Sequence, residues 1–209
     1  MSTTFEVYPG MSEIPSFKQV VNLSNERLKA YLSSIHVHAD IAVNVELREC
    51  MTNKVLHLDL KKPFTFEYTH YAWFTVGAEM GGSDAYFRKL YELDKDVWEA
   101  ELASNMRAKA MENHIQDSLK LGYYWYFRRS VGQPAMVNLT YGIIAASLAQ
   151  LTKGFVFTED GAWEYRKFPT TAEDFFNWYF IPELSGYEND RNWSRECISE
   201  IIQRYGAIG

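Results

Sequence analysis

Cysteine and positive charge are both scarce in this sequence. Its 209 residues include two cysteines, Cys50 and Cys197, and nothing in their spacing pairs them. So few cysteines in a chain of this size favour a reducing compartment. The chain has 21 lysines and arginines against 27 acidic residues, which gives a formal net charge of −6. This balance argues against nucleic acid and against an anionic membrane surface as direct ligands.

Long apolar runs are also missing. No stretch approaches the roughly 20 apolar residues that a membrane-spanning helix needs. Residues 1–10, MSTTFEVYPG, contain neither the positively charged segment nor the apolar segment of a secretory signal. We therefore expect a cytoplasmic protein that has no membrane partner.

The common catalytic motifs do not occur. The sequence has no G-x-S-x-G turn, no glycine-rich phosphate loop, no H-E-x-x-H and no C-x-x-C. Adjacent carboxylates such as Glu159-Asp160 fall in a predicted turn, where a local structural role explains them. The sequence therefore predicts no catalytic residue and no cofactor, and it disfavours an enzyme.

One histidine cluster leaves a second hypothesis open. His36 and His38 form an H-x-H sequence, and Asp40 follows two residues later. On a strand, this spacing would place both imidazoles and the carboxylate on one face, where they can ligate a metal ion. No other cluster completes such a site, so we predict no metal ligand. A small metal-dependent hydrolase that uses these residues remains the alternative.

Aromatic residues, in contrast, are abundant. They make up 16% of the chain, with 14 tyrosines and 6 tryptophans, beside 47% hydrophobic and 23% charged residues. A chain of this length can bury a substantial core. Tyrosine and tryptophan are also favoured anchors of protein interfaces. The excess therefore indicates either an aromatic-rich core or a surface that binds a partner.

The stretch from residue 122 to residue 165 has the clearest pattern. Residues 123–127 are all aromatic and predict a strand buried on both faces. Pro134 then begins a helix that is apolar on almost every side and ends near Gly154, so we expect a buried central helix. Asp160-Gly161 lies between two short aromatic segments and predicts a β-hairpin.

The rest of the chain predicts an α+β fold with strands before helices. We expect one domain over residues 1–209, with a possible subdivision near Gly81-Gly82. An antiparallel meander in the N-terminal half would pack against a mostly helical C-terminal half that contains the buried central helix and the hairpin. The predicted elements are a strand over 3–8, a helix capped by Ser24, a meander over 40–77, helical structure over 84–121, a helix capped near Thr171 and a helix from Trp193 to Tyr205.

Acidic residues gather in two places. The first acidic set follows the predicted subdivision, and the second lies in the loop before Trp193. Both have aromatic neighbours, so they predict either solvated surface or an acidic patch that meets a cationic partner. The candidate partner-binding residues are Tyr91, Glu92, Asp94, Asp96, Trp98, Glu99 and Glu101 for the first set and Glu183, Tyr187, Glu188 and Asp190 for the second.

The C-terminal part of the chain carries a recognisable series of residues. An alanine-rich helix runs into L-T-x-G, and then come a strand, E-D-G-A-W and P-T-T-A-E-D-F-F-N-W-Y-F-x-P. This pattern resembles bacterial immunity proteins of polymorphic toxin and type VI secretion systems, and among them the immunity protein 52 group, which is associated with restriction-endonuclease-like toxins. The residues that carry it are Leu151, Thr152, Gly154, Asp160, Gly161, Ala162, Trp163, Phe175, Trp178, Tyr179 and Pro182.

The resemblance implies a protein that is not an enzyme. Such a protein would bind a cognate toxin domain in the cytoplasm of the producing cell and occlude or distort its active site. A nuclease toxin presents cationic groups to phosphates, so an acidic inhibitor can use the same electric field. The motif residues would build the scaffold, and no binding residue is carried over from the family. A protein adaptor that has no toxin is a further alternative.

Overall fold

The computed structural model describes residues 2–206, which form an α+β fold, as the sequence predicts. The strands are β1 (Thr3–Tyr8), β2 (Val43–Glu49), β3 (Val55–Leu56), β4 (His70–Val76), β5 (Ser83–Lys89), β6 (Tyr123–Arg129), β7 (Phe155–Phe157) and β8 (Thr170–Thr171). The α-helices are α1 (Phe17–Ser34), α2 (Glu92–Ser104), α3 (Met106–Ala110), α4 (Glu112–Lys120), α5 (Ala135–Leu151), α6 (Ala172–Trp178) and α7 (Glu188–Tyr205). Two 3₁₀ helices are η1 (Tyr165–Lys167) and η2 (Pro182–Leu184).

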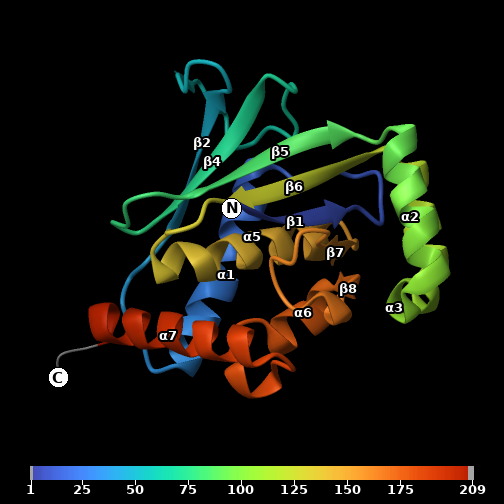
Figure 1. The fold of residues 1–209 in the computed structure, drawn as a ribbon. Coiled ribbons are helices and arrows are strands. Elements are labelled where there is room, and N and C mark those ends of the chain that lie inside the picture. The colour runs from blue at the N-terminus through green and yellow to red at the C-terminus, as the bar shows by residue number, and fades with distance from the viewer. Residues whose placement is uncertain (1, 207–209) are drawn as a thin grey trace.

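One eight-stranded sheet organises these elements. Its strand order is β3-β2-β4-β5-β6-β1-β7-β8, and every neighbouring pair is antiparallel. Helices α1, α5, α6 and α7 lie on one side of the sheet, and α2 and α3 lie beside the end of β5 and the start of β6 (Figure 1). We call the side that packs against α5 the covered face and the opposite side the outer face.

Helix α5 is the centre of the core, as predicted. All residues from Ala135 to Ala149 are buried. The ring of Tyr141 stacks on the ring of Phe5 in β1, with 4.8 Å between their centroids. A Cβ atom at Gly142 would lie 2.4 Å from the Tyr179 ring, so glycine is required where α6 meets α5.

Helix α5 ends at Leu151, near Gly154, as predicted. The residue in the left-handed conformation is Lys153, with a φ of 49°, and not Gly154. Gly154 is needed for another reason, because a Cβ there would lie 2.0 Å from the carbonyl oxygen of Tyr8. The missing side chain lets the chain leave α5 in close contact with β1 and begin β7 beside it.

The predicted hairpin around Asp160-Gly161 does not form. Strand β7 pairs with β1 and β8 instead, and residues 158–164 lead into η1. The Asp160 carboxylate accepts hydrogen bonds from the N and Oγ1 atoms of Thr4, at 3.0 and 2.9 Å, which fix the loop to β1. Trp163 packs against Phe180, with 5.2 Å between ring centroids. These long-range contacts outweigh the local turn preference.

Strand β5 replaces the start of the helix predicted from Asp84 to Leu121. Asp84 forms an ion pair with Arg128 on β6, and Tyr86 stacks on Tyr126 with 4.7 Å between ring centroids. Such cross-strand pairs stabilise a sheet. The helical structure begins only at α2 and is divided into three helices.

Helix α1 begins earlier than predicted. Its N-cap is Ser16, whose side chain accepts a hydrogen bond from the backbone N of Gln19 at 3.2 Å, while Gln19 Oε1 accepts one from the backbone N of Ser16. The predicted cap, Ser24, is buried in the middle of the helix and donates to the carbonyl oxygen of Val20. A reciprocal capping box therefore fixes the start of α1.

The N-terminal strands are antiparallel, as predicted, but their order is different, because β2 lies between β3 and β4. Strands β4 and β5 pair across the turn that contains Gly81-Gly82, so one sheet includes strands from both sides of this predicted subdivision. Thr171 caps α6, as predicted, by accepting a hydrogen bond from the backbone N of Asp174 at 3.2 Å. Helix α7 begins at Glu188 and not at Trp193.

Candidate functional site

Helix α2 packs on the outer face of the sheet through one tryptophan. Phe5 contacts α5, so the alternate residues Glu6 and Tyr8 of β1 point to the outer face. The Trp98 side chain is 1% exposed. It lies 5.1 Å from the Tyr8 ring and 4.7 Å from the Phe157 ring, measured between centroids. The prediction that Trp98 belongs to a partner-binding surface is therefore wrong, because its indole anchors α2 to the sheet.

The exposed side of α2 carries an apolar stripe beside an acidic one. Leu93 is 77% exposed and Val97 is 36% exposed, and their four-residue spacing places them along one line of the helix. Asp96 and Glu99 are exposed on the neighbouring line. Within residues 2–206, no ion pair involves either carboxylate. Helix α2 therefore presents apolar side chains next to two uncompensated negative charges, and Tyr91 is exposed at its start.

The other acids of the first set have local partners. Glu92 forms an ion pair with Lys95, with 2.8 Å between Oε1 and Nζ. Asp94 accepts a hydrogen bond at 2.6 Å from the backbone N–H at the N-cap of α2. Glu101 accepts a hydrogen bond from the Tyr165 hydroxyl. These carboxylates stabilise the helix and its attachment, so they are less available to a partner than the two exposed ones.

Helix η1 lies between the two acidic sets. Its Tyr165 bonds to Glu101 of the first set, and its Arg166 guanidinium lies 5.8 Å from the ring centroid of Tyr187 in the second. Arg166 and Lys167 therefore place positive charge between the sets. The two sets do not form one continuous acidic patch.

The acids of the second set have their own structural surroundings. Glu183 lies 3.6 Å from Arg195, measured between carboxylate and guanidinium atoms. Glu188 and Asp190 occupy the first turn of α7, where a negative charge interacts favourably with the helix dipole. Burial raises the pKa of Asp190, and the nearby charge of Glu164 adds to the shift.

A half-buried carboxylate, Glu6, lies on the part of the outer face that α2 covers. Burial raises its pKa to about 8, and the charge of Glu159 adds to this shift. Asp94 on α2 and Asp160 raise it further. The Tyr8 hydroxyl donates a hydrogen bond to Glu6 at 2.9 Å and opposes part of the shift. This acid could not be singled out from the sequence, because a single glutamate in a strand usually faces solvent.

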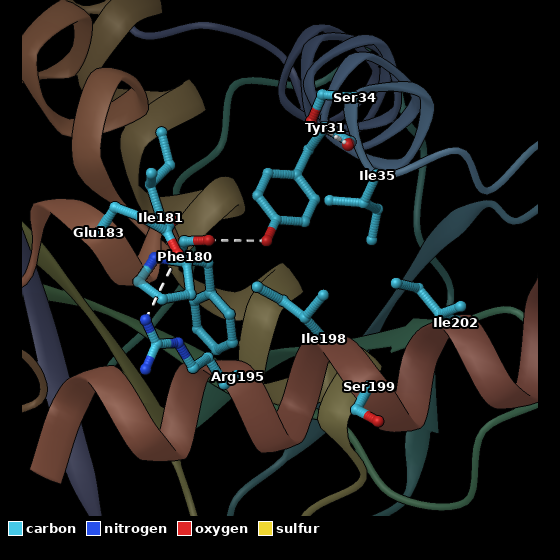
Figure 2. Close-up of a pocket in the computed structure, with 11 residues that line it drawn as sticks. Tyr31, Ser34, Ile35, Phe180, Ile181, Glu183, Arg195, Ile198, Ser199 and Ile202 are labelled. Carbon is cyan, nitrogen blue, oxygen red and sulfur yellow. Dashed lines mark hydrogen bonds and ion pairs between the residues drawn. The ribbon is translucent and has the colours of Figure 1, made fainter.

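A cavity of about 580 Å³ lies between α1 and α7, and Figure 2 shows the residues that line it. Ile35 of α1 and Ile198 of α7 contribute apolar surface. The Tyr31 hydroxyl donates to the carbonyl oxygen of Phe180 at 2.8 Å, which closes one side. Glu183 of the second acidic set borders this cavity, so it faces an apolar space as well as solvent.

The remainder of the outer face is rich in arginine and aromatic residues. A second cavity, of about 400 Å³, lies there over strands β2, β4, β5 and β6. We call this surface the open face and define it by Arg48, Trp73, Tyr86, Arg88, Tyr126 and Arg128.

The sequence did not reveal the open face. Strand β6 was predicted to be buried on both sides, but Tyr124 and Tyr126 are only half-buried and point outward. Tyr86 and Arg88 were predicted to lie on a helix, which hid their alternation with inward residues. The signal that could have revealed it is the run D-A-Y-F-R, whose polar and apolar residues alternate with a period of two.

The histidine cluster lacks the geometry that the metal hypothesis requires. His36, with a φ of 61°, belongs to the turn after α1, and strand β2 begins only at Val43. His36, His38 and Asp40 are exposed and do not lie on a strand. Residues 2–206 contain no group of three histidine, cysteine or carboxylate side chains placed to hold a metal ion.

Comparisons with known proteins give no relative: no family model matches the chain, and no curated protein or solved structure does. Between residues 2 and 206, no helix combines the length and apolarity needed to cross a membrane. The resemblance to immunity proteins therefore stays a prediction.

Proposed function

We propose that this protein is an immunity protein that binds a secreted antibacterial toxin and blocks the active site of that toxin in the cytoplasm of the producing cell. The observation that carries the proposal is the exposed side of α2, where Leu93 and Val97 lie beside Asp96 and Glu99. In a complex with a cationic protein, the apolar pair would be buried and both carboxylates would gain partners.

The anchoring of α2 supports this role. Trp98 holds the helix against the sheet, so its exposed stripes are already ordered before binding, and the entropy lost on association is small. The negative charge of α2 favours a cationic partner such as a nuclease toxin. A nuclease toxin carries cations that would otherwise hold phosphates, and an acidic helix competes for the same groups.

Protection from toxicity is the first test. The gene immediately upstream is expressed in a heterologous bacterium, alone and together with this protein. We expect the upstream product to stop growth when expressed alone, and co-expression to restore growth. An upstream product that is harmless alone, or that remains toxic in the presence of this protein, would contradict the proposal.

Binding measurements with purified proteins then test whether the exposed side of α2 contacts the toxin. Replacing Asp96 and Glu99 by lysine should weaken binding to the upstream product by about tenfold or more, because each substitution sets like charges against each other. The control replaces Glu26 on α1 and Glu196 on α7 by lysine, which changes the net charge equally. Equal losses of affinity in both variants would show that overall charge, and not α2, determines binding.

A further inference from the structure

The open face is a second surface whose chemistry differs from that of α2. Its side chains come from four adjacent strands, so the sheet itself positions them. Arg128 on β6 lies opposite Asp84 on β5, and Tyr86 and Tyr126 form the next pair on the same face of these strands. The helices of the core lie on the other side of the sheet (Figure 1).

Aromatic rings hold the arginines of the open face in place. The guanidinium carbons of Arg88 and Arg128 lie 5.1 and 5.6 Å from the centroid of the Tyr86 ring. Arg88 also lies 5.5 Å from the Tyr126 ring. At the far side, Arg48 lies 5.2 Å from the Trp73 ring. Because these cation–π contacts orient the guanidinium groups in advance, a ligand that binds them loses little side-chain entropy.

Two of the three arginines already have a carboxylate partner. Both Nε and Nη2 of Arg128 donate to Asp84, and Arg48 donates to Glu46 at 3.0 and 2.7 Å.

Arg88 is different. It makes only long hydrogen bonds, at 3.3 Å to the carbonyl oxygen of Tyr68 and at 3.5 Å to the Tyr126 hydroxyl, and within residues 2–206 it has no acidic partner. The open face therefore keeps one uncompensated guanidinium, which suits a carboxylate.

Exposed apolar residues also lie near the open face. Tyr68, whose carbonyl binds Arg88, is 78% exposed. Met51 is 90% exposed and follows Cys50, which lines the cavity. Val131 is 67% exposed and follows Ser130, which also lines the cavity. Large exposed apolar side chains near arginine, tyrosine and tryptophan are typical of a surface that binds protein.

The packing of the rings argues against single-stranded nucleic acid as the occupant. Proteins that bind single-stranded nucleic acid stack its bases on aromatic rings whose faces are free. Here the Tyr86 ring stacks on Tyr126, at 4.7 Å and 14°, and on Tyr71, at 5.8 Å and 25°. Neighbouring rings and guanidinium groups therefore occupy these faces. The net charge of −6 also opposes a polyanion.

From these observations we infer that the open face binds an acidic segment of a protein partner. A carboxylate of that segment pairs with Arg88 beside Tyr86, and its apolar side chains lie against Trp73 and Tyr68. The partner thus has the opposite charge from the cationic surface proposed for α2. The inference does not depend on the proposed function.

Selection from a random peptide library tests this inference. Phage-displayed 12-residue peptides (about 40 Å when extended) are selected on the full chain. The affinity of the enriched peptides is then measured for the native protein and for Arg88→Gln. We expect the enriched peptides to carry acidic residues next to an aromatic or aliphatic one, and Arg88→Gln to lower their affinity by about tenfold.

The control variant is Arg27→Gln. Arg27 lies on α1, on the covered side, with its guanidinium carbon 4.6 Å from the Phe176 ring centroid, so it matches Arg88 in chemistry but not in place. Peptide affinity should be unchanged in this variant, and thermal unfolding of both variants shows that they are folded. Inorganic phosphate and a single-stranded RNA of 20 nucleotides, long enough for a typical binding site of about 4–16 nucleotides, are titrated in parallel.

Several results would overturn the inference. They are a selection without enriched peptides, enriched peptides without acidic residues, and an affinity that is insensitive to Arg88→Gln or equally sensitive to Arg27→Gln. Tighter binding of the RNA would assign the face to nucleic acid, and displacement of the peptides by low concentrations of phosphate would assign it to a small anion.

Discussion

The two faces of the central sheet are built from the same strands and have opposite chemistry. On β6, Phe127 points to the covered face and is fully buried, whereas its neighbour Tyr126 points outward and is half-buried. On β5, Ala85 is buried on the covered face, and its neighbour Tyr86 is half-buried on the outer face. Because successive side chains of a strand point to opposite faces, adjacent residues have different roles. The covered face supplies the buried apolar area that stabilises the fold, and the outer face is left for α2 and for polar, aromatic contacts.

The first way to test this comparison is to truncate one residue on each face of β6. Phe127→Ala should lower the free energy of unfolding by about 3–5 kcal/mol, because it leaves a cavity in the core. Tyr126→Ala should lower it by about 1 kcal/mol, since most of the ring stays near water. Urea unfolding followed by far-ultraviolet circular dichroism measures both values. Equal losses would show that the outer face is as important to stability as the covered one.

The second test concerns the part of the outer face that α2 covers. Trp98→Ala should lower the free energy of unfolding by about 3 kcal/mol, because this indole is the fully buried anchor between α2 and the sheet. Amide hydrogen exchange should accelerate in α2 more than in α5. Conversely, a variant in which α2 exchanges as slowly as the native helix would show that other contacts hold it.

The third test concerns a pH dependence at Glu6. Its pKa is about 8 in the folded protein against a reference value of 4.5, so the folded state binds a proton more tightly than the unfolded chain does. The contribution of Glu6 to stability is therefore fully present below about pH 4.5 and is lost as the pH rises through 8. Glu6→Gln should remove this decline. The urea midpoints of both proteins, measured between those pH values, test this. If both midpoints change equally with pH, the decline does not come from Glu6.

Segments with an uninterrupted local pattern could be predicted from the sequence. The apolar run from Ala135 to Leu151 allows no exposed side, so the buried α5 follows directly. The Thr171 cap of α6 was predictable for the same reason, because its hydrogen bond lies within three residues.

Segments decided by distant partners could not be predicted. In residues 84–89 the apolar spacing is compatible with a helix, and the pairing of Asp84 with Arg128 on β6 selects the strand. Asp160-Gly161 favours a hairpin locally, but the bonds between Asp160 and Thr4 stabilise a loop instead.

The candidate site was only partly accessible from the sequence. The acidic character of α2 could be read directly, but the burial of Trp98 depends on Phe157, which is far away in the chain. The separation of the two acidic sets depends on Arg166 of η1, a segment predicted to be a strand.

The most direct test of the account is amide hydrogen exchange, measured by mass spectrometry, in the complex with the product of the upstream gene. We expect binding to slow exchange in α2, from Glu92 to Ser104, and to leave exchange in α5 unchanged. Slower exchange elsewhere, with α2 exchanging as it does in the free protein, would contradict the claim that this helix contacts the toxin.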